Sequence, residues 1–218
     1  SFPTRRSSDL IDQGEELFLI DANLSNSGKS ILQAAQEIGK PITAILVTHA
    51  HADHVGSIDE LMQELDGCRL ITSERSAAYM RGDFTLPAGD SGSARESNFP
   101  KIQSVPTQIA SPGDTFGSLT MVPSPGHTRD HISWFEEREN AIFCGDSWQS
   151  AGGVAVMGDT RWLFPLPALV TWNKAVSVDS AAETLKLNPQ ILCPGHGKVI
   201  ENAGAIMQAA YQRAKNKI

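Results

Sequence analysis

The chain is poor in cysteine and in long apolar runs, and each shortage excludes a class of protein. Three cysteines in 218 residues are too few, and odd in number, for the disulfide framework that small secreted domains use in place of a large core. No apolar run approaches the roughly 20 residues that cross a bilayer, so we expect no membrane span. Each cysteine lies beside apolar residues in a predicted strand, and we interpret all three as buried thiols: Cys68, Cys144 and Cys193.

Basic clusters are also missing. The formal net charge is −7, and no Lys- or Arg-rich run follows Arg6. A nucleic-acid surface normally carries a basic patch, so we expect a small-molecule substrate and neither nucleic-acid nor membrane partners. Free buried thiols favour a reducing compartment, and we therefore expect the protein in the cytoplasm.

The first ten residues differ in character from the rest of the chain. Residues 1–10 read SFPTRRSSDL, which resembles the translation of a common DNA-sequencing adapter. We interpret this segment as a non-native artefact and leave it out of the fold argument. The remaining 11–218 have the length of one domain with a substantial core.

Apolar periodicity predicts helices and strands without strict alternation. In 28–39 the apolar residues recur at helical spacing, and Gly39 followed by Pro41 ends that helix. Ser57 with Glu60 three residues later predicts a capping box at the start of another helix. Strand runs in both halves, mixed with helices, predict two packed sheets with helices outside. Strands are predicted at 17–20, 43–48, 69–72, 104–110, 117–122, 131–136, 141–145 and 191–193, and helices at 28–39, 57–65, 73–80, 172–187 and 203–215.

Metal-ligand side chains crowd the segment that follows the predicted strand 43–48. Residues 48–54 read THAHADH. Because residues two apart in an extended segment point the same way, His49 and His51 can share one ion, while Asp53 and His54 reach a second. Zinc binds imidazole nitrogen and carboxylate oxygen, and a catalytic zinc keeps one coordination position open for water.

Three further candidate ligands stand beside glycines at strand ends. They are His127 in Gly-His-Thr, Asp146 in Gly-Asp-Ser and His196 in Gly-His-Gly. A lone histidine in a loop is more often solvated than bound to metal. These motifs in this order, after the histidine-rich segment, nevertheless predict a metal centre presented by loops on a rigid scaffold.

The ordered motifs resemble those of the metallo-β-lactamase-fold hydrolases, from about Leu17 to the C-terminus. The resemblance implies an α/β (α+β) fold, a four-layer αββα sandwich with metals in a cleft at the sheet edges. The family usually opens with additional N-terminal strands, which we expect to be missing here. By resemblance, one metal is held by His49, His51 and His127, a second by Asp53, His54 and His196, and Asp146 bridges both.

We expect two zinc ions as cofactors, with iron or manganese as alternatives. A water between two ions about 3.5 to 4 Å apart loses a proton near neutral pH and attacks a carbonyl or phosphoryl centre. We expect Asp53 to act as a proton shuttle in addition to binding metal. His131 is left outside the ligand set, as either a hydrogen-bonding partner of a ligand or a structural histidine.

Several branches of the family fit this chain poorly. True β-lactamases of this fold usually lack the bridging aspartate that Asp146 would provide. Hydroxyacylglutathione hydrolases carry a further C-terminal helical domain, whereas this chain ends one helix after Gly197, and the nucleases have inserted domains or basic surfaces. We therefore expect 11–218 to hydrolyse carbonyl esters, lactones or thioesters. The alternatives are a phosphodiesterase, a mononuclear iron enzyme similar to sulfur dioxygenases, and an inert binding module.

Five aromatic residues are candidates for contact with the substrate. Lactonases of the superfamily often place a tyrosine near the substrate carbonyl, and Tyr79 is the better placed of the two tyrosines; its alternative is a surface position. Four other aromatic residues either line an apolar substrate pocket or cap the core: Trp148, Trp162, Phe164 and Trp172.

Overall fold

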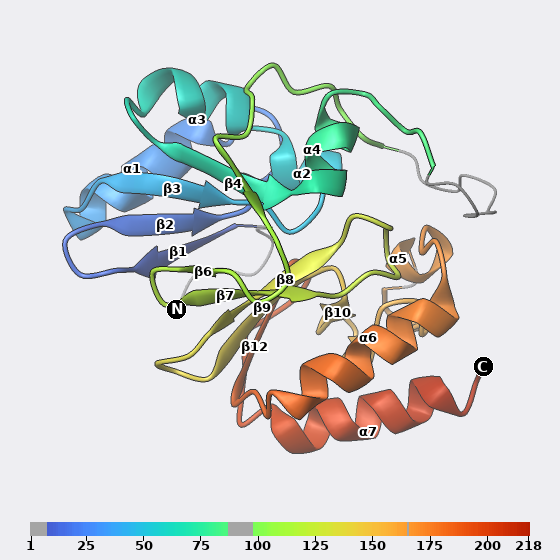
Figure 1. The fold of residues 1–218 in the computed structure, drawn as a ribbon. Helices are drawn as coiled ribbons and strands as arrows, with labels where there is room; N and C mark the ends of the chain where they lie inside the picture. Colours follow the sequence, from blue (N-terminus) through green and yellow to red (C-terminus); the bar gives the residue numbers. More distant parts are fainter. Residues whose placement is uncertain (1–7, 87–97, 165) are drawn as a thin grey trace.

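The computed structural model describes residues 8–86, 98–164 and 166–218. Two β-sheets pack face to face, and helices cover the outer face of each sheet (Figure 1). This is the predicted four-layer αββα sandwich, so the predicted fold class is confirmed. Within the described residues, no helix is long and apolar enough to cross a membrane.

The first sheet is mostly parallel. Its strand order is β1-β2-β3-β4-β5, with β1 antiparallel to β2 and every other pair parallel. All four residues of β2 are buried, as expected where a parallel sheet is covered on both faces. The strands are β1 Asp9–Asp12, β2 Leu17–Ile20, β3 Ile42–Leu46, β4 Arg69–Ser73 and β5 Gln108–Ala110.

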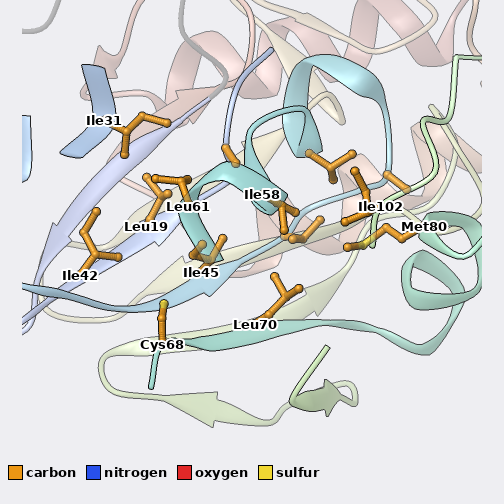
Figure 2. Packing of buried hydrophobic residues seen from close by; sticks show 14 of the residues in the cluster. Leu19, Ile31, Ile42, Ile45, Ile58, Leu61, Cys68, Leu70, Met80 and Ile102 are labelled. Carbon is orange, nitrogen blue, oxygen red and sulfur yellow. The ribbon is translucent and has the colours of Figure 1, made fainter. Parts of the chain in front are cut away.

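Helices of the first half cover the outer face of this sheet. Ile31 and Leu61 are buried against Leu19 and Ile45 of the strands, and Figure 2 shows these side chains gathered into one apolar layer. Removing such side chains from water is the main favourable contribution to folding. The helices are α1 Gly28–Ile38, α2 Ala52–Val55, α3 Ile58–Glu64 and α4 Glu74–Met80.

The second sheet has the order β13-β12-β9-β8-β7-β6, and β12 with β9 is its parallel pair. A separate two-stranded ribbon, β10 with β11, follows β9. The strands are β6 Thr115–Phe116, β7 Leu119–Pro123, β8 Ile132–Glu136, β9 Ala141–Gly145, β10 Trp148–Gln149, β11 Ala155–Val156, β12 Ile191–Pro194 and β13 Ile200–Glu201.

Two more apolar layers complete the sandwich. Phe18 of β2 and Trp134 of β8 belong to the layer between the sheets. Trp148 and Met207 belong to the layer between the second sheet and its helices. Those helices are α5 Leu166–Leu169, α6 Lys174–Lys186 and α7 Gly204–Lys215.

Strand direction decides where the metal-ligand motifs can meet. Because β8 is antiparallel to both β7 and β9, and β12 is parallel to β9, the strands β7, β9 and β12 all run in one direction. Their carboxyl ends therefore lie at one edge of the second sheet. The motifs with His127, Asp146 and His196 follow these three ends, and the motif from His49 to His54 follows β3 of the first sheet.

The predicted capping box at the start of α3 is wrong. Ser57 makes no side-chain cap; its Oγ instead donates to the carbonyl of Leu24 at 2.7 Å and accepts from the N–H of Ser27 at 2.8 Å. Glu60 accepts from the N–H groups of Asn26 at 2.6 Å and Gly28 at 3.2 Å. The loop before α1 lies over the start of α3, and its free N–H groups take the acceptors that a local cap would use.

Strand β1 begins inside the segment interpreted as foreign. Asp9 pairs with Ile20, and Leu10 pairs with Leu19. Backbone pairing requires no particular side chain, so a strand can form here whatever the origin of residues 1–10. The interpretation of these residues as a non-native artefact stays a prediction. Residues 1–7, 87–97 and 165 lie outside the described residues.

The predicted buried thiols are confirmed. All three cysteines are free and buried, and burial raises the pKa of Cys68 to about 11. A thiol with so high a pKa carries little thiolate at neutral pH and is a poor nucleophile.

Candidate metal centre

The structure brings all seven predicted metal ligands together at one edge of the sandwich. Their nitrogen and oxygen atoms form three overlapping groups, within each of which the atoms lie no more than 4.8 Å apart. The groups share His49 and His54, so they form one continuous centre. They are His49, His51 and His127; His49, His54 and Asp146; and Asp53, His54 and His196.

Three imidazoles form the first half of the centre. His51 Nδ1 lies 3.1 Å from His49 Nε2 and 3.1 Å from His127 Nε2. Four ligands about 2.0 to 2.1 Å from a tetrahedral zinc lie about 3.3 to 3.4 Å from one another, close to these separations. The donor set and its spacing therefore fit one divalent ion.

Hydrogen bonds fix which nitrogen of His49 can bind metal. Thr48 Oγ1 donates to Asp21 Oδ2 at 2.7 Å, so it accepts from His49 Nδ1 at 3.1 Å. The proton of a neutral His49 therefore sits on Nδ1, and the lone pair of Nε2 faces the centre. Burial lowers the pKa of His49 well below its usual value and that of His127 to about 3, so both imidazoles are neutral, as ligation requires.

Asp53, His54 and His196 form the second half. His196 Nε2 lies 3.3 Å from Asp53 Oδ2, and His54 Nε2 lies 3.9 Å from the same oxygen. His54 Nδ1 lies 2.7 Å from Asp21 Oδ2, which holds a proton on Nδ1. His54 Nε2 is buried and has no hydrogen-bond partner among the described residues; a metal ion is a partner that would satisfy it.

Asp146 joins the two halves. Its Oδ2 lies 3.4 Å from His127 Nε2 and 3.1 Å from His196 Nε2, and its Oδ1 lies 3.4 Å from His54 Nε2. Burial alone would raise the pKa of this carboxyl, but His196 and His54 hold it well below its usual value. An ionised carboxylate whose Oδ2 lies between the two halves, with Oδ1 facing the second half, fits a bridging ligand.

Asp21 is a site residue that the sequence argument missed. It stands directly after β2, in the left-handed region at φ 56°, and it is buried. Its carboxylate accepts from the N–H and Oγ1 of Thr48 at 2.7 Å each, in addition to His54 Nδ1. It therefore orients both His49, through Thr48, and His54. An aspartate immediately after a buried apolar strand was the available signal.

The structure supports the first of the two interpretations of His131. Its Nε2 accepts the backbone N–H of Asp146 at 2.9 Å, so its Nδ1 donates to Ser124 Oγ at 2.9 Å. Burial lowers the pKa of His131 well below its usual value, which keeps the ring neutral. A buried histidine thus holds the main chain of the bridging aspartate.

Asp130, the residue before His131, supports the first half of the centre. Its Oδ2 accepts from the N–H of Ala50 at 2.8 Å and from Ser76 Oγ at 2.8 Å. Ala50 lies between His49 and His51, so this carboxylate positions the segment that carries both.

Two glycines leave room for the ligands. The N–H of Gly195 donates to the carbonyl of Gly145 at 2.7 Å. A Cβ at Gly195 would lie 2.6 Å from Asp146 Oδ1 and 2.8 Å from His54 Cε1. Gly145 has φ +44°, and a Cβ there would lie 2.6 Å from Thr48 Oγ1. Any side chain at either position would displace a ligand or its support.

The prediction that Tyr79 lies near a substrate carbonyl is wrong, as is its surface alternative. Tyr79 is 1% exposed and belongs to the core beside the first sheet. Its ring lies 5.4 Å from that of Phe84 and 4.8 Å from that of Phe99. The apolar face of α4 takes it into the core.

The four aromatic residues proposed for a pocket or the core differ in position. Trp162 is 96% exposed and is not part of the core. Trp148 is buried, and its Nε1 donates to Thr184 at 3.1 Å, so it belongs to the core. The ring of Trp172 lies under the guanidinium of Arg129, at 4.3 Å. Phe164, by contrast, lies beside the metal centre, with its ring 5.6 Å from that of His196.

The family model described as "Metallo-beta-lactamase superfamily" matches residues 3–196. The chain belongs to this superfamily. The resemblance of the motifs to this superfamily is thereby confirmed. The predicted enzyme class, a metal-dependent hydrolase, is confirmed as well, since relatives are named as a metallo-hydrolase and a hydroxyacylglutathione hydrolase. The individual roles of the seven candidate ligands stay a prediction.

Bacterial relatives include proteins of similar length. An uncharacterized protein of Bacillus subtilis, YobT, is 40% identical over 207 residues, which is 94% of this chain and 89% of that protein. A probable metallo-hydrolase of the same organism, YflN, is 28% identical over 82% of this chain and 74% of that protein. A hydroxyacylglutathione hydrolase of Nitrobacter hamburgensis is 32% identical, but over only 56% of this chain and 40% of that protein.

Solved structures show the same fold. The protein TTHA1623, in a di-iron-bound form, has a TM-score of 0.65 at 24% identity and covers 90% of each chain. The metallo-β-lactamase DIM-1 has a TM-score of 0.72 at 16% identity, covering 97% of this chain and 87% of that one. At these identities, the likeness concerns the fold alone.

Proposed function

We propose that this protein is a dinuclear metal hydrolase of carbonyl esters, a class that includes lactones and thioesters. The observation that carries the proposal is the position of Asp146, whose carboxylate faces His127 of the first half and His196 of the second at 3.4 and 3.1 Å. One carboxylate between two ligand groups is the arrangement that a pair of ions needs.

A pair of divalent ions would supply Lewis acidity and lower the pKa of a bound water. The chain's own residues then have separate tasks. His49, His51 and His127 would hold one ion, and Asp53, His54 and His196 the other. Imidazole-rich sites suit zinc and also iron; we propose zinc because five of the seven candidate ligands are imidazoles and the other two are carboxylates.

Asp53 is the carboxylate best placed to handle a proton. Its side chain is 27% exposed, whereas that of Asp146 is 4% exposed. Hydrogen bonding by His196 and the charge of His54 outweigh burial and lower the pKa of Asp53 to about 2. At neutral pH Asp53 is therefore ionised and can accept a hydrogen bond from an attacking water, orienting it toward the substrate carbonyl.

The proposal is supported by the names of relatives, two of which are described as a metallo-hydrolase and a hydroxyacylglutathione hydrolase. The acidic net charge of −7 agrees with a neutral ester better than with a nucleic acid. A small-molecule substrate is therefore proposed, and no nucleic-acid partner.

The test is a substrate panel run with defined metals. Protein loaded with zinc, iron or manganese is assayed on lactones, thioesters, aryl esters and bis(p-nitrophenyl) phosphate. We expect turnover of carbonyl esters with two bound metals per chain. Asp146→Ala should lose metal and activity together, and Asp179→Ala, an exposed aspartate of α6, is the matched control.

Three results would contradict the proposal. Turnover of the phosphodiester alone would favour a phosphodiesterase. A single bound iron with oxygen uptake would favour an oxygenase. Metal-loaded protein that is inactive on the whole panel would favour a binding module.

A further inference from the structure

The two most exposed large apolar side chains of the described residues are neighbours in the chain. Trp162 is 96% exposed and Leu163 85% exposed, and Leu169 and Val170 follow at 65% and 47%. Single exposed apolar residues are ordinary on protein surfaces. Several together, with a tryptophan almost entirely in water, mark a place where an apolar partner binds.

Trp162 and Leu163 form the tip of a tight turn. The N–H of Phe164 donates to the carbonyl of Arg161 at 3.0 Å, and the two residues form an isolated β-bridge. The residues between them are therefore the two central positions of a β-turn. Their side chains are presented to solvent by a hydrogen-bonded backbone.

Both ends of the turn lie close to the loop that carries His196, one through the segment 150–152 and the other through a ring contact. On the outgoing side, Arg161 Nε donates to the carbonyl of Gly152 at 3.2 Å. The segment just before Gly152 is bonded to the metal centre, since the N–H of Ser150 donates to the carbonyl of His196 at 3.0 Å. On the returning side, the ring of Phe164 lies 5.6 Å from the ring of His196. The apolar tip thus has a fixed position relative to one candidate ligand.

Aromatic side chains also lie beside the first half of the centre. The ring of Phe99 stacks on that of His51, with the ring centroids 4.9 Å apart, and the ring of Phe84, which is 50% exposed, lies 5.7 Å from Phe99. Aromatic rings therefore lie against one histidine of each half. A substrate whose carbonyl sits at the ions would meet apolar surface beside both halves.

We infer that the turn 161–164 binds the apolar acyl chain of the substrate, which makes the substrate class medium-chain acyl esters or thioesters. The inference rests on the proposed function, because it places the substrate carbonyl at the metal centre. Continuity of the turn with His196 through Phe164 favours a substrate group as the occupant over a protein partner or a second copy of the chain.

Chain-length dependence tests the inference. We expect kcat/KM of the zinc-loaded protein to rise along a series of p-nitrophenyl esters from acetyl to octanoyl. A methylene that leaves water completely contributes about fourfold, so partial coverage of six added methylenes predicts a rise of at least about tenfold. The double variant Trp162→Ala with Leu163→Ala should remove most of this rise. Val105→Ala, which alters a residue 70% exposed in the first half, should leave it intact.

A binding measurement separates failure of this inference from failure of the proposed function. Calorimetry of the zinc-loaded protein with octanoate and acetate needs no turnover. Octanoate binding at least about tenfold tighter than acetate, with the preference lost in the double variant, supports the inference even if no ester is hydrolysed. Equal binding of the two acids, or a preference that survives in the double variant, overturns it. So does self-association in light scattering that the double variant abolishes without any chain-length effect.

Discussion

Asp21 Oδ2 accepts a hydrogen bond from His54 Nδ1 at 2.7 Å, and this single contact decides which nitrogen of His54 can bind a metal. With the proton held on Nδ1, the lone pair of Nε2 faces Asp146 and Asp53. The same carboxylate oxygen accepts from Thr48 Oγ1, which in turn orients His49. One buried aspartate therefore sets the tautomers of a ligand in each half of the centre.

Replacing Asp21 by Asn should weaken the second metal position by about 10- to 100-fold. The amide oxygen of Asn would keep the N–H of Thr48, so its NH2 group would face His54 Nδ1 and drive the proton onto Nε2. Metal affinity is measured by competition with a chelator. Asp12→Asn is the control for loss of an aspartate elsewhere in the first sheet. If Asp21→Asn left the metal affinity of the second position unchanged, the orienting role of Asp21 would be contradicted.

Metal affinity should depend on pH differently at the two positions. The Asp146 carboxylate raises the pKa of His196 to about 10 in the metal-free chain, against the effect of burial, so ligation must displace a proton. Against the effect of burial, the charges of Asp21 and Asp146 also raise the pKa of His54 well above its usual value, so a second proton must leave. Affinity at the second position should therefore rise more than tenfold per pH unit between pH 6 and 9. His127, with a pKa of about 3, needs no deprotonation in that range.

The two positions can be separated for this measurement. His51→Ala leaves the second position and His54→Ala leaves the first, each followed by chelator competition across the pH range. A flat profile for the second position would contradict ligation by His54 and His196.

Gly145→Ala should destabilise the protein by more than about 2 kcal/mol. The added Cβ would lie 2.6 Å from Thr48 Oγ1 and 2.9 Å from His131 Nε2, and alanine is also strained at φ +44°. Gly113→Ala isolates the backbone strain, because Gly113 has φ +87° with no atom within 4 Å of its Cβ position. Urea denaturation should show a clearly smaller loss for Gly113→Ala, and equal losses would refute the steric account.

Asp9 should make the protein less stable as the pH rises. Burial, with a contribution from Asp21, raises its pKa from 3.8 to about 7. The folded chain therefore keeps the proton that the unfolded chain releases, and stability falls between about pH 4 and pH 7. Asp9→Asn should raise the Tm at pH 8 and change it little at pH 4.

A residue in the same strand provides the control for that experiment. Asp12 is exposed, and hydrogen bonding to Lys40 lowers its pKa, so its contribution to stability is favourable at neutral pH. Asp12→Asn should not raise the Tm at pH 8. A lower Tm for Asp9→Asn at pH 8 would contradict the predicted cost of burying the carboxyl.

The candidate ligands could be predicted from the sequence because their signals are local. His127, Asp146 and His196 each stand beside a glycine within four residues of the end of a strand, and the other four lie within one six-residue segment. Apolar periodicity likewise located α1 and β2, because the spacing of their own apolar residues shows which side chains are buried.

The supports of the centre could not be predicted in the same way because their partners are distant in sequence. Asp130 bonds to Ala50, 80 positions away, and Asp21 bonds to His54, 33 positions away. Glu60 has the spacing of a local cap, yet the loop before α1 supplies its partners. In each case tertiary packing, which periodicity does not report, decided the contact.

The bond from Ala50 to Asp130 has a consequence for how the chain could be divided. Asp130 belongs to the second sheet's half, while Ala50 lies among the ligands of the first. A fragment that ended before β7 would carry His49, His51, Asp53 and His54 but would lack the carboxylate that positions their segment. The two fragments would have to reassociate before either held its ligands in place. Metal binding by a mixture of the fragments would therefore measure their reassociation directly.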